Sequence, residues 1–152
     1  MVFCFSQSNR KEPQKMNVVM IDGAIRHDHP CLKNINITQY CYINGSWTIA
    51  EEMQEETGHG TAIANILASH INNGIHLINF CVFDKELKTT IGKLISALEY
   101  IYNNIDTYII NLSLGSLFDN SQLYDVCKRL SEKNVILVAG FDNNGAISFP
   151  AA

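Results

Sequence analysis

The chain has 152 residues, of which 47% are hydrophobic and 17% are charged, and its net charge at pH 7 is −4. This length suits a single domain that can bury a core, and the composition excludes a disordered chain. The small acidic charge gives no electrostatic reason to expect nucleic acid or an anionic membrane as a partner. No segment approaches the roughly 20 apolar residues of a membrane span.

The N-terminal residues 1–16 are predicted to form an extension ahead of the folded domain. Their apolar run is too short for a secretory signal, and charged residues follow it. The cysteines are scattered, odd in number and without a C-x-x-C pair, which argues against a disulfide framework and favours a reducing compartment: Cys4, Cys31, Cys41, Cys81 and Cys127. The sequence therefore predicts a cytoplasmic protein, and nothing in it predicts a cofactor.

Four apolar runs predict buried strands: Asn17–Asp22, Ile75–Phe83, Tyr108–Gly115 and Val135–Gly140. Their nearly continuous apolar character is typical of a parallel sheet that is covered on both faces. The stretch from Gln39 to Thr57 lacks such a run and is predicted to be a loop. Its acidic part, EEMQEET, is most simply a solvated approach to the helix that follows.

Helical patterns alternate with these strands. Small and apolar residues predict a short helix over Thr61–Ser69, and helical spacing of apolar residues predicts two more, over 91–101 and 123–130. Thr89 or Thr90 can cap the second helix and Ser121 the third. The alternation predicts an α/β fold with a doubly wound, mainly parallel sheet and helices on both faces.

In such a sheet, reactive groups belong at the carboxyl ends of strands and the amino ends of helices. Asp22 ends the first strand, His59 opens the first helix, and Asn143 follows the fourth strand. Taken singly, Asp22 could be a turn residue and His59 a surface residue. Together, an acid, a base and an amide donor at one sheet edge predict a nucleophilic acyl-transfer site.

Four segments in sequence order resemble the motif blocks of subtilisin-like serine proteases, the subtilases. They are VVMIDGAIRHDHPCL, GHGTAIANILA, IINLSLGS and VILVAGFDNNGAISFPAA. The resemblance implies that Asp22 orients the general base His59 and that Asn143 stabilises the oxyanion. It also implies that substrate binds along two segments, one of Ser113, Leu114 and Gly115, the other of Val138, Ala139 and Gly140.

The chain departs from the family pattern at two positions. Gly23 replaces the usual hydroxyl residue after the catalytic Asp, and Ala62 replaces a second His in the family's H-G-T-H block. Asp22-Gly23 followed by His29-Pro30-Cys31 is similar to the subtilases that mature ribosomally made peptides, such as the cyanobactin proteases.

The family's nucleophilic serine lies in a G-T-S-M-A-like block beyond the aromatic-Pro-Ala turn, which matches Phe149–Ala151 here. No such block occurs up to Ala152, and Ser113 and Ser148 belong to other blocks. We therefore expect residues 17–152 to be a partial catalytic domain of a serine endopeptidase that acts on peptides or proteins. Two alternatives stay open: a non-catalytic peptide-binding remnant, and one piece of a protease that a second polypeptide completes.

Two further features have structural explanations. His27 and His29 could be read as metal ligands, but a loop without further ligands does not supply zinc's usual four-coordinate site, so no metal is predicted. Cys31 could be a reactive thiol, yet a buried structural cysteine is the simpler expectation.

Overall fold

The computed structural model describes residues 16–50, 57–70, 74–115, 119–140 and 149–150. Within them, six strands form one sheet in the order β3-β2-β4-β1-β5-β6. All neighbours run parallel except β2 and β3. The strands are β1 (Met16–Asp22), β2 (Asn36–Ile43), β3 (Ser46–Ala50), β4 (Ile75–Cys81), β5 (Ile109–Leu112) and β6 (Ile136–Ala139).

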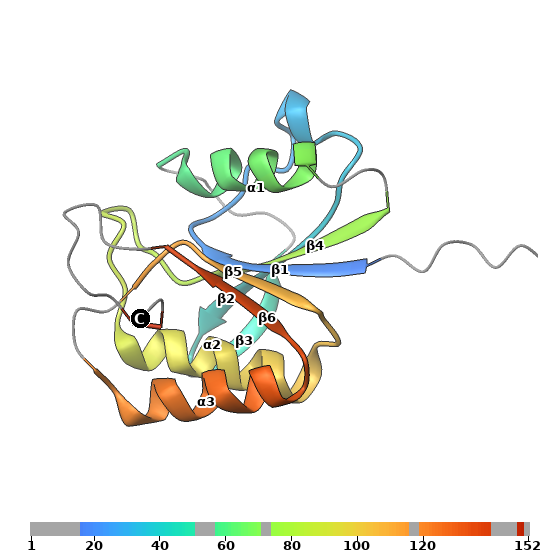
Figure 1. Ribbon diagram of the computed structural model, residues 1–152. Helices are drawn as coiled ribbons and strands as arrows, with labels where there is room; N and C mark the ends of the chain where they lie inside the picture. Colours follow the sequence, from blue (N-terminus) through green and yellow to red (C-terminus); the bar gives the residue numbers. More distant parts are fainter. Residues whose placement is uncertain (1–15, 51–56, 71–73, 116–118, 141–148, 151–152) are drawn as a thin grey trace, which may run out of the picture.

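Helices cover both faces of this sheet (Figure 1). Helix α1 (His59–His70) lies on one face, together with the short 3-10 helix η1 (Pro30–Leu32). Helices α2 (Ile91–Asn104) and α3 (Ser121–Glu132) lie on the other face. The predicted doubly wound α/β architecture is confirmed, with the four predicted strands β4, β1, β5 and β6 adjacent and parallel.

The middle of the central strand β1, Val18–Ile21, is apolar and buried on both faces of the sheet. Side chains alternate along a strand, so Val18 and Met20 join the core beneath α1. Val19 and Ile21 join the larger core beneath α2 and α3. Each of these four side chains is 0% exposed. The two cores fix the helices on either side of the sheet, and with them the strand end that carries Asp22.

The prediction of a loop over Gln39–Thr57 is wrong for most of its length. Strands β2 and β3 form an antiparallel hairpin here, with Ile43 opposite Ser46. Asn44 and Gly45 make the turn with φ values of 50° and 83°, which Asn-Gly adopts readily and most residues resist. Residues 51–56, which hold most of the acidic run, lie outside the described part of the chain.

The helix starts differ slightly from those expected. The Thr90 hydroxyl caps α2 by accepting a hydrogen bond from the Lys93 N–H, as predicted. Helix α3 is capped by Asn120 instead of Ser121, because the Asn120 side chain accepts from the Leu123 N–H at 3.0 Å. Helix α1 begins at His59, two residues before the expected start.

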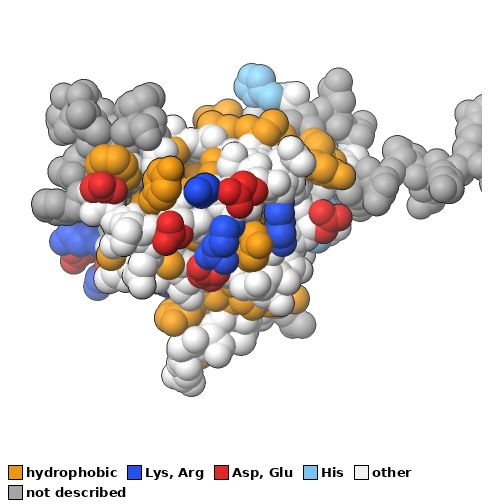
Figure 2. Space-filling model, turned by 60° about the horizontal axis from the view of Figure 1, so that its bottom comes forward, with side chains coloured by type: hydrophobic (Ala, Val, Ile, Leu, Met, Phe, Trp, Pro, Cys, Tyr) orange, Lys and Arg blue, Asp and Glu red, His pale blue; other side chains and the backbone are white. Residues whose placement is uncertain are grey.

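The α2–α3 face carries acidic and basic side chains intermixed (Figure 2). Arg129 pairs with Glu99 across the two helices, and Lys133 lies 3.8 Å from the centre of the Tyr102 ring. Of the helices in the described ranges, none is long and apolar enough to cross a bilayer.

Candidate active site

The carboxylate of Asp22 and the ring of His59 meet at the carboxyl edge of the sheet. Asp22 Oδ1 lies 2.7 Å from His59 Nδ1 and accepts a second hydrogen bond from the Gly23 N–H at 2.6 Å. The Asp22 side chain is 0% exposed, whereas the His59 side chain is 38% exposed. The other carboxylate oxygen, Oδ2, is buried without a hydrogen-bond partner in the part of the chain that the structure describes.

This contact determines which ring nitrogen of His59 can act as a base. An ionised carboxylate can only accept hydrogen bonds, so the neutral ring carries its proton on Nδ1 and keeps a free lone pair on Nε2. The ring is further held by Phe83, whose edge-on ring lies 6.3 Å away between centroids. A half-exposed imidazole oriented by a buried carboxylate can take a proton from a neighbouring hydroxyl or thiol.

The two glycines beside His59 serve different purposes. A Cβ atom on Gly60 would lie 2.4 Å from the Ala24 carbonyl oxygen and 2.6 Å from that of Gly23, so only glycine lets α1 approach the loop after β1. Gly58 has open space around it, but its φ of +75° is one that other residues adopt at a cost. Gly60 therefore allows the close approach and Gly58 the turn into the helix.

Comparison with known proteins supports a single family. The minor extracellular protease Epr of Bacillus subtilis is 32% identical over an alignment of 111 positions that covers 65% of this chain. The solved structure of the prenylagaramide maturation protease PagA is 26% identical, covers 91% of this chain and superposes with a TM-score of 0.69. These relatives are subtilisin-like serine proteases, and the chain is similar to that family in sequence and fold. No family model matches it.

The subtilase fold extends to a second solved structure, the protease domain of PatA. The match covers 95% of this chain with a TM-score of 0.73. Because the identity is only 21%, this likeness supports the fold alone. The chain spans 17% of the length of Epr, 50% of the PagA chain and 57% of the PatA chain.

The two predicted substrate segments lie at the carboxyl ends of β5 and β6, at the same sheet edge as Asp22. The Ser113 N–H donates to the Ile21 carbonyl at 3.3 Å, which brings Ser113 beside the end of β1. The Gly140 N–H donates to the Leu112 carbonyl at 3.1 Å. Leu114 is half-buried and Gly115 exposed; Val138 and Ala139 end β6. Asn143 and Ser148 lie outside the described residues.

Sequence reasoning missed the polar groups beneath the pair. Cys41 and Cys81 occupy the same register row as Asp22 on neighbouring strands. Burial raises the pKa of the Cys81 thiol to about 12, so it stays protonated at neutral pH and is a poor nucleophile. Gln39 and Asn79 form a buried pair two residues earlier on the same strands. A polar Asn79 inside the run HLINF was the available signal.

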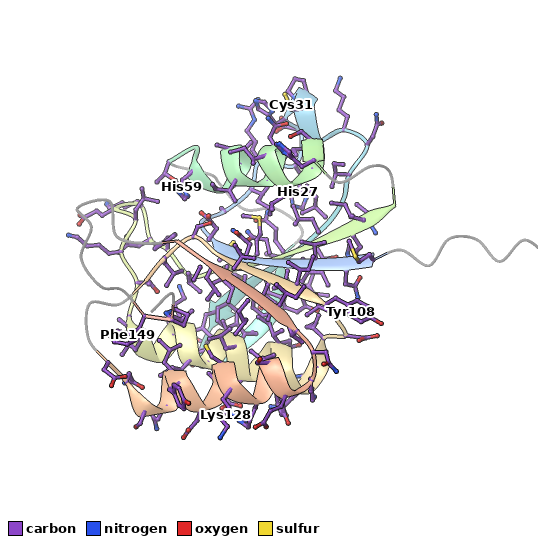
Figure 3. The ribbon with its side chains drawn as sticks, in the orientation of Figure 1. His27, Cys31, His59, Tyr108, Lys128 and Phe149 are labelled. Atoms are coloured by element: carbon purple, nitrogen blue, oxygen red, sulfur yellow. The ribbon has the colours of Figure 1, made fainter. Side chains whose placement is uncertain are left out.

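His27 and Cys31 lie at the opposite end of α1 from His59 (Figure 3). His29 Nδ1 accepts a hydrogen bond from the Cys31 N–H at 3.4 Å at the start of η1. Cys31 is exposed, so the expectation of a buried cysteine is wrong, because η1 turns it away from the core. Within the described ranges, no three His, Cys, Asp or Glu side chains gather as a metal site requires.

A cavity of about 650 Å³ lies on the α3 side of the sheet. It is lined by α3 together with Leu137, Phe149 and Pro150, and by none of the residues predicted for the active site. Because α1 and His59 lie on the other side of the sheet (Figures 1 and 3), this cavity is separate from the Asp22–His59 pair.

Proposed function

We propose that this chain supplies the acid–base part of a subtilisin-like serine endopeptidase. His59 is the general base, Asp22 orients it, and residues 17–152 are the part of the catalytic domain that carries both. The observation that carries the proposal is the 2.7 Å contact between the buried Asp22 Oδ1 and His59 Nδ1, whose ring is open to solvent on the other side.

In the proposed reaction, a serine Oγ attacks the carbonyl carbon of a peptide bond and its proton passes to His59 Nε2. The imidazolium so formed is stabilised by Asp22, which remains ionised, and then protonates the leaving amine. Water then attacks the carbonyl carbon of the acyl-enzyme and gives a proton to His59 Nε2, which passes it to the serine Oγ as the acyl bond breaks. Asn143 donates to the oxyanion, while the backbones of Ser113–Gly115 and Val138–Gly140 pair with the substrate.

The substrate that we propose is a peptide, in the cytoplasm, cut during maturation of a ribosomally made precursor. Likeness to PagA, a prenylagaramide maturation protease, supports this class. The nucleophilic serine is proposed to lie outside residues 1–152. Among the described residues, the only hydrogen bond of the His59 ring is to Asp22, and no hydroxyl or thiol is hydrogen-bonded to Nε2.

The test is labelling by a fluorophosphonate probe, which reacts with activated serines. The chain alone should not label, since loss of the serine lowers kcat by roughly 10⁶-fold in subtilisin. The genomic sequence after the Ala152 codon, read in three frames, is searched for a G-T-S block, and the segment that carries it is added. We expect labelling of that segment's serine, and its loss in His59→Ala.

Two results would contradict the proposal. Labelling of the 152-residue chain alone, abolished by His59→Ala, would reveal a nucleophile within it. Peptide binding without labelling, with and without the added segment, would favour the alternative of a non-catalytic peptide-binding protein.

A further inference from the structure

Two buried amide side chains lie beneath the loop that follows Asp22. Gln39 on β2 is 1% exposed and Asn79 on β4 is 0% exposed, on strands whose other inward residues are largely apolar. Burying an amide is unfavourable by a few kcal/mol unless it is hydrogen-bonded. Their presence at the edge that carries Asp22 therefore calls for a physical reason.

Gln39 holds both polar groups of one backbone residue. Its Oε1 accepts from the Ile25 N–H at 2.7 Å, and its Nε2 donates to the Ile25 carbonyl at 2.9 Å, as a neighbouring strand would. Asn79 Nδ2 donates to the Gly23 carbonyl at 2.9 Å and to Gln39 Oε1 at 3.0 Å. The sheet thus holds the loop Gly23–Ile25 from below through side chains of two different strands.

Helix α1 holds the same loop from above. The Gly60 Cα lies so close to the Gly23 and Ala24 carbonyls that a methyl group would not fit. Thr61 Oγ1 accepts from the Arg26 N–H at 2.8 Å. The first turn of α1, which begins with His59, therefore rests directly on a loop whose height above the sheet is determined by Gln39 and Asn79.

We propose that Gln39 and Asn79 are positioning residues for the Asp22–His59 pair. By fixing the loop Gly23–Ile25, they set the distance between the helix that carries His59 and the strand that carries Asp22. The margin is small, since a displacement of about 0.5 Å lengthens the 2.7 Å contact to the usual limit of about 3.2 Å. The inference rests on the proposed function only in taking Asp22 and His59 as a catalytic pair.

The test is NMR of the 152-residue chain, read at the His59 ring. Gln39→Met and Asn79→Leu keep similar volumes and remove the hydrogen bonds to the loop. We expect loss of the downfield Nδ1–H resonance, or at least about tenfold faster exchange of that proton, and mixed ring tautomers by ¹⁵N shifts. Amide protection in β1 and β4 should persist, which shows that the sheet is intact.

The matched control is Thr38→Val, next to Gln39 on the same strand. It removes the 2.8 Å contact between Thr38 Oγ1 and His76 Nε2 and leaves the loop untouched. The His59 resonance should be unchanged. If Gln39→Met and Asn79→Leu lower the melting temperature while the resonance and tautomer remain as in the parent, the two amides are merely structural and the proposal is overturned.

A measurement on the unaltered chain covers the case in which the variants do not fold. The Ile25 amide should exchange as slowly as the core amides of β1, because its acceptor is a buried Gln39 oxygen. Exchange at the rate of an ordinary loop amide would refute the proposal. These readouts need no hydrolysis, so failure of the proposed enzymatic function would leave them interpretable.

Discussion

At Asp22, the hydrogen bonds are distributed unevenly over the carboxylate. Oδ1 accepts hydrogen bonds from both the Gly23 N–H and His59 Nδ1, while Oδ2 has no hydrogen-bond partner among the described residues. The glycine after Asp22 has no hydroxyl to offer it. The geometry of the pair therefore depends on how closely the backbone around Gly23 and Gly60 can approach.

We expect Gly60→Ala to be destabilising and Gly23→Ala to be nearly neutral, although both positions are adjacent to the pair. A methyl group at Gly60 would overlap the Ala24 and Gly23 carbonyl oxygens, so stability should fall by about 1–3 kcal/mol and the His59 Nδ1–H resonance should be lost. A methyl group at Gly23 meets only Thr57 Oγ1 at 3.8 Å, so stability should change by less than about 1 kcal/mol. Urea denaturation followed by circular dichroism measures both, and equal effects would contradict the assignment.

At the scale of elements, the helix starts place side chains at the edges of the sheet. The start of α3 is held by a short polar cap, because the first N–H groups of a helix have no partner within it. Asn120 supplies that partner with its side-chain oxygen and adopts the extended backbone of a cap, at φ −142° and ψ 116°.

Asn120→Ala should therefore lower the free energy of unfolding by about 1 kcal/mol, as loss of an N-cap usually does. Ser121→Ala is the matched control, since Ser121 is the first residue inside α3 and is exposed. It should change stability by less than about 0.5 kcal/mol. Thermal melting curves of the two variants measure these losses of stability. A larger loss for Ser121→Ala would show that Ser121, as predicted from the sequence, is the N-cap.

At the scale of the whole molecule, the described sheet ends at β6. This strand pairs with β5 on one side only, and its side chains Ile136 and Val138 are 59% and 49% exposed. Unpaired backbone groups next to exposed apolar side chains favour pairing with another strand edge. A second copy of the chain offers the same edge.

We expect the 152-residue chain to self-associate at micromolar concentration in sedimentation experiments. Val138→Lys, which puts a charge on this edge strand, should shift it toward the monomer. Tyr124→Lys is a suitable control, because this side chain is more exposed than Val138, at 65%, but lies on α3. A monomeric parent chain with one sharp unfolding transition would show that the edge needs no partner.

Much of this molecule follows from local patterns in the sequence. Within the residues that the structure describes, apolar runs identified four of the six strands and helical spacing all three α-helices, because burial leaves these patterns in the sequence. The proximity of Asp22 and His59 was also predictable, since a strand end and the following helix start share one edge in this topology. The β2–β3 hairpin could have been predicted from Asn44-Gly45, but the sequence analysis missed it because its strands lack a continuous apolar run.

The contacts that hold the loop Gly23–Ile25 could not be predicted from such local patterns. Gln39 and Ile25 are 14 residues apart, Asn79 and Gly23 are 56 apart, and the clearance at Gly60 depends on carbonyl oxygens of another element. Composition and periodicity determined which segments are strands and helices and which edge holds the reactive groups. Only the tertiary structure decided what holds them at 2.7 Å, because that distance depends on contacts between segments with no shared local pattern.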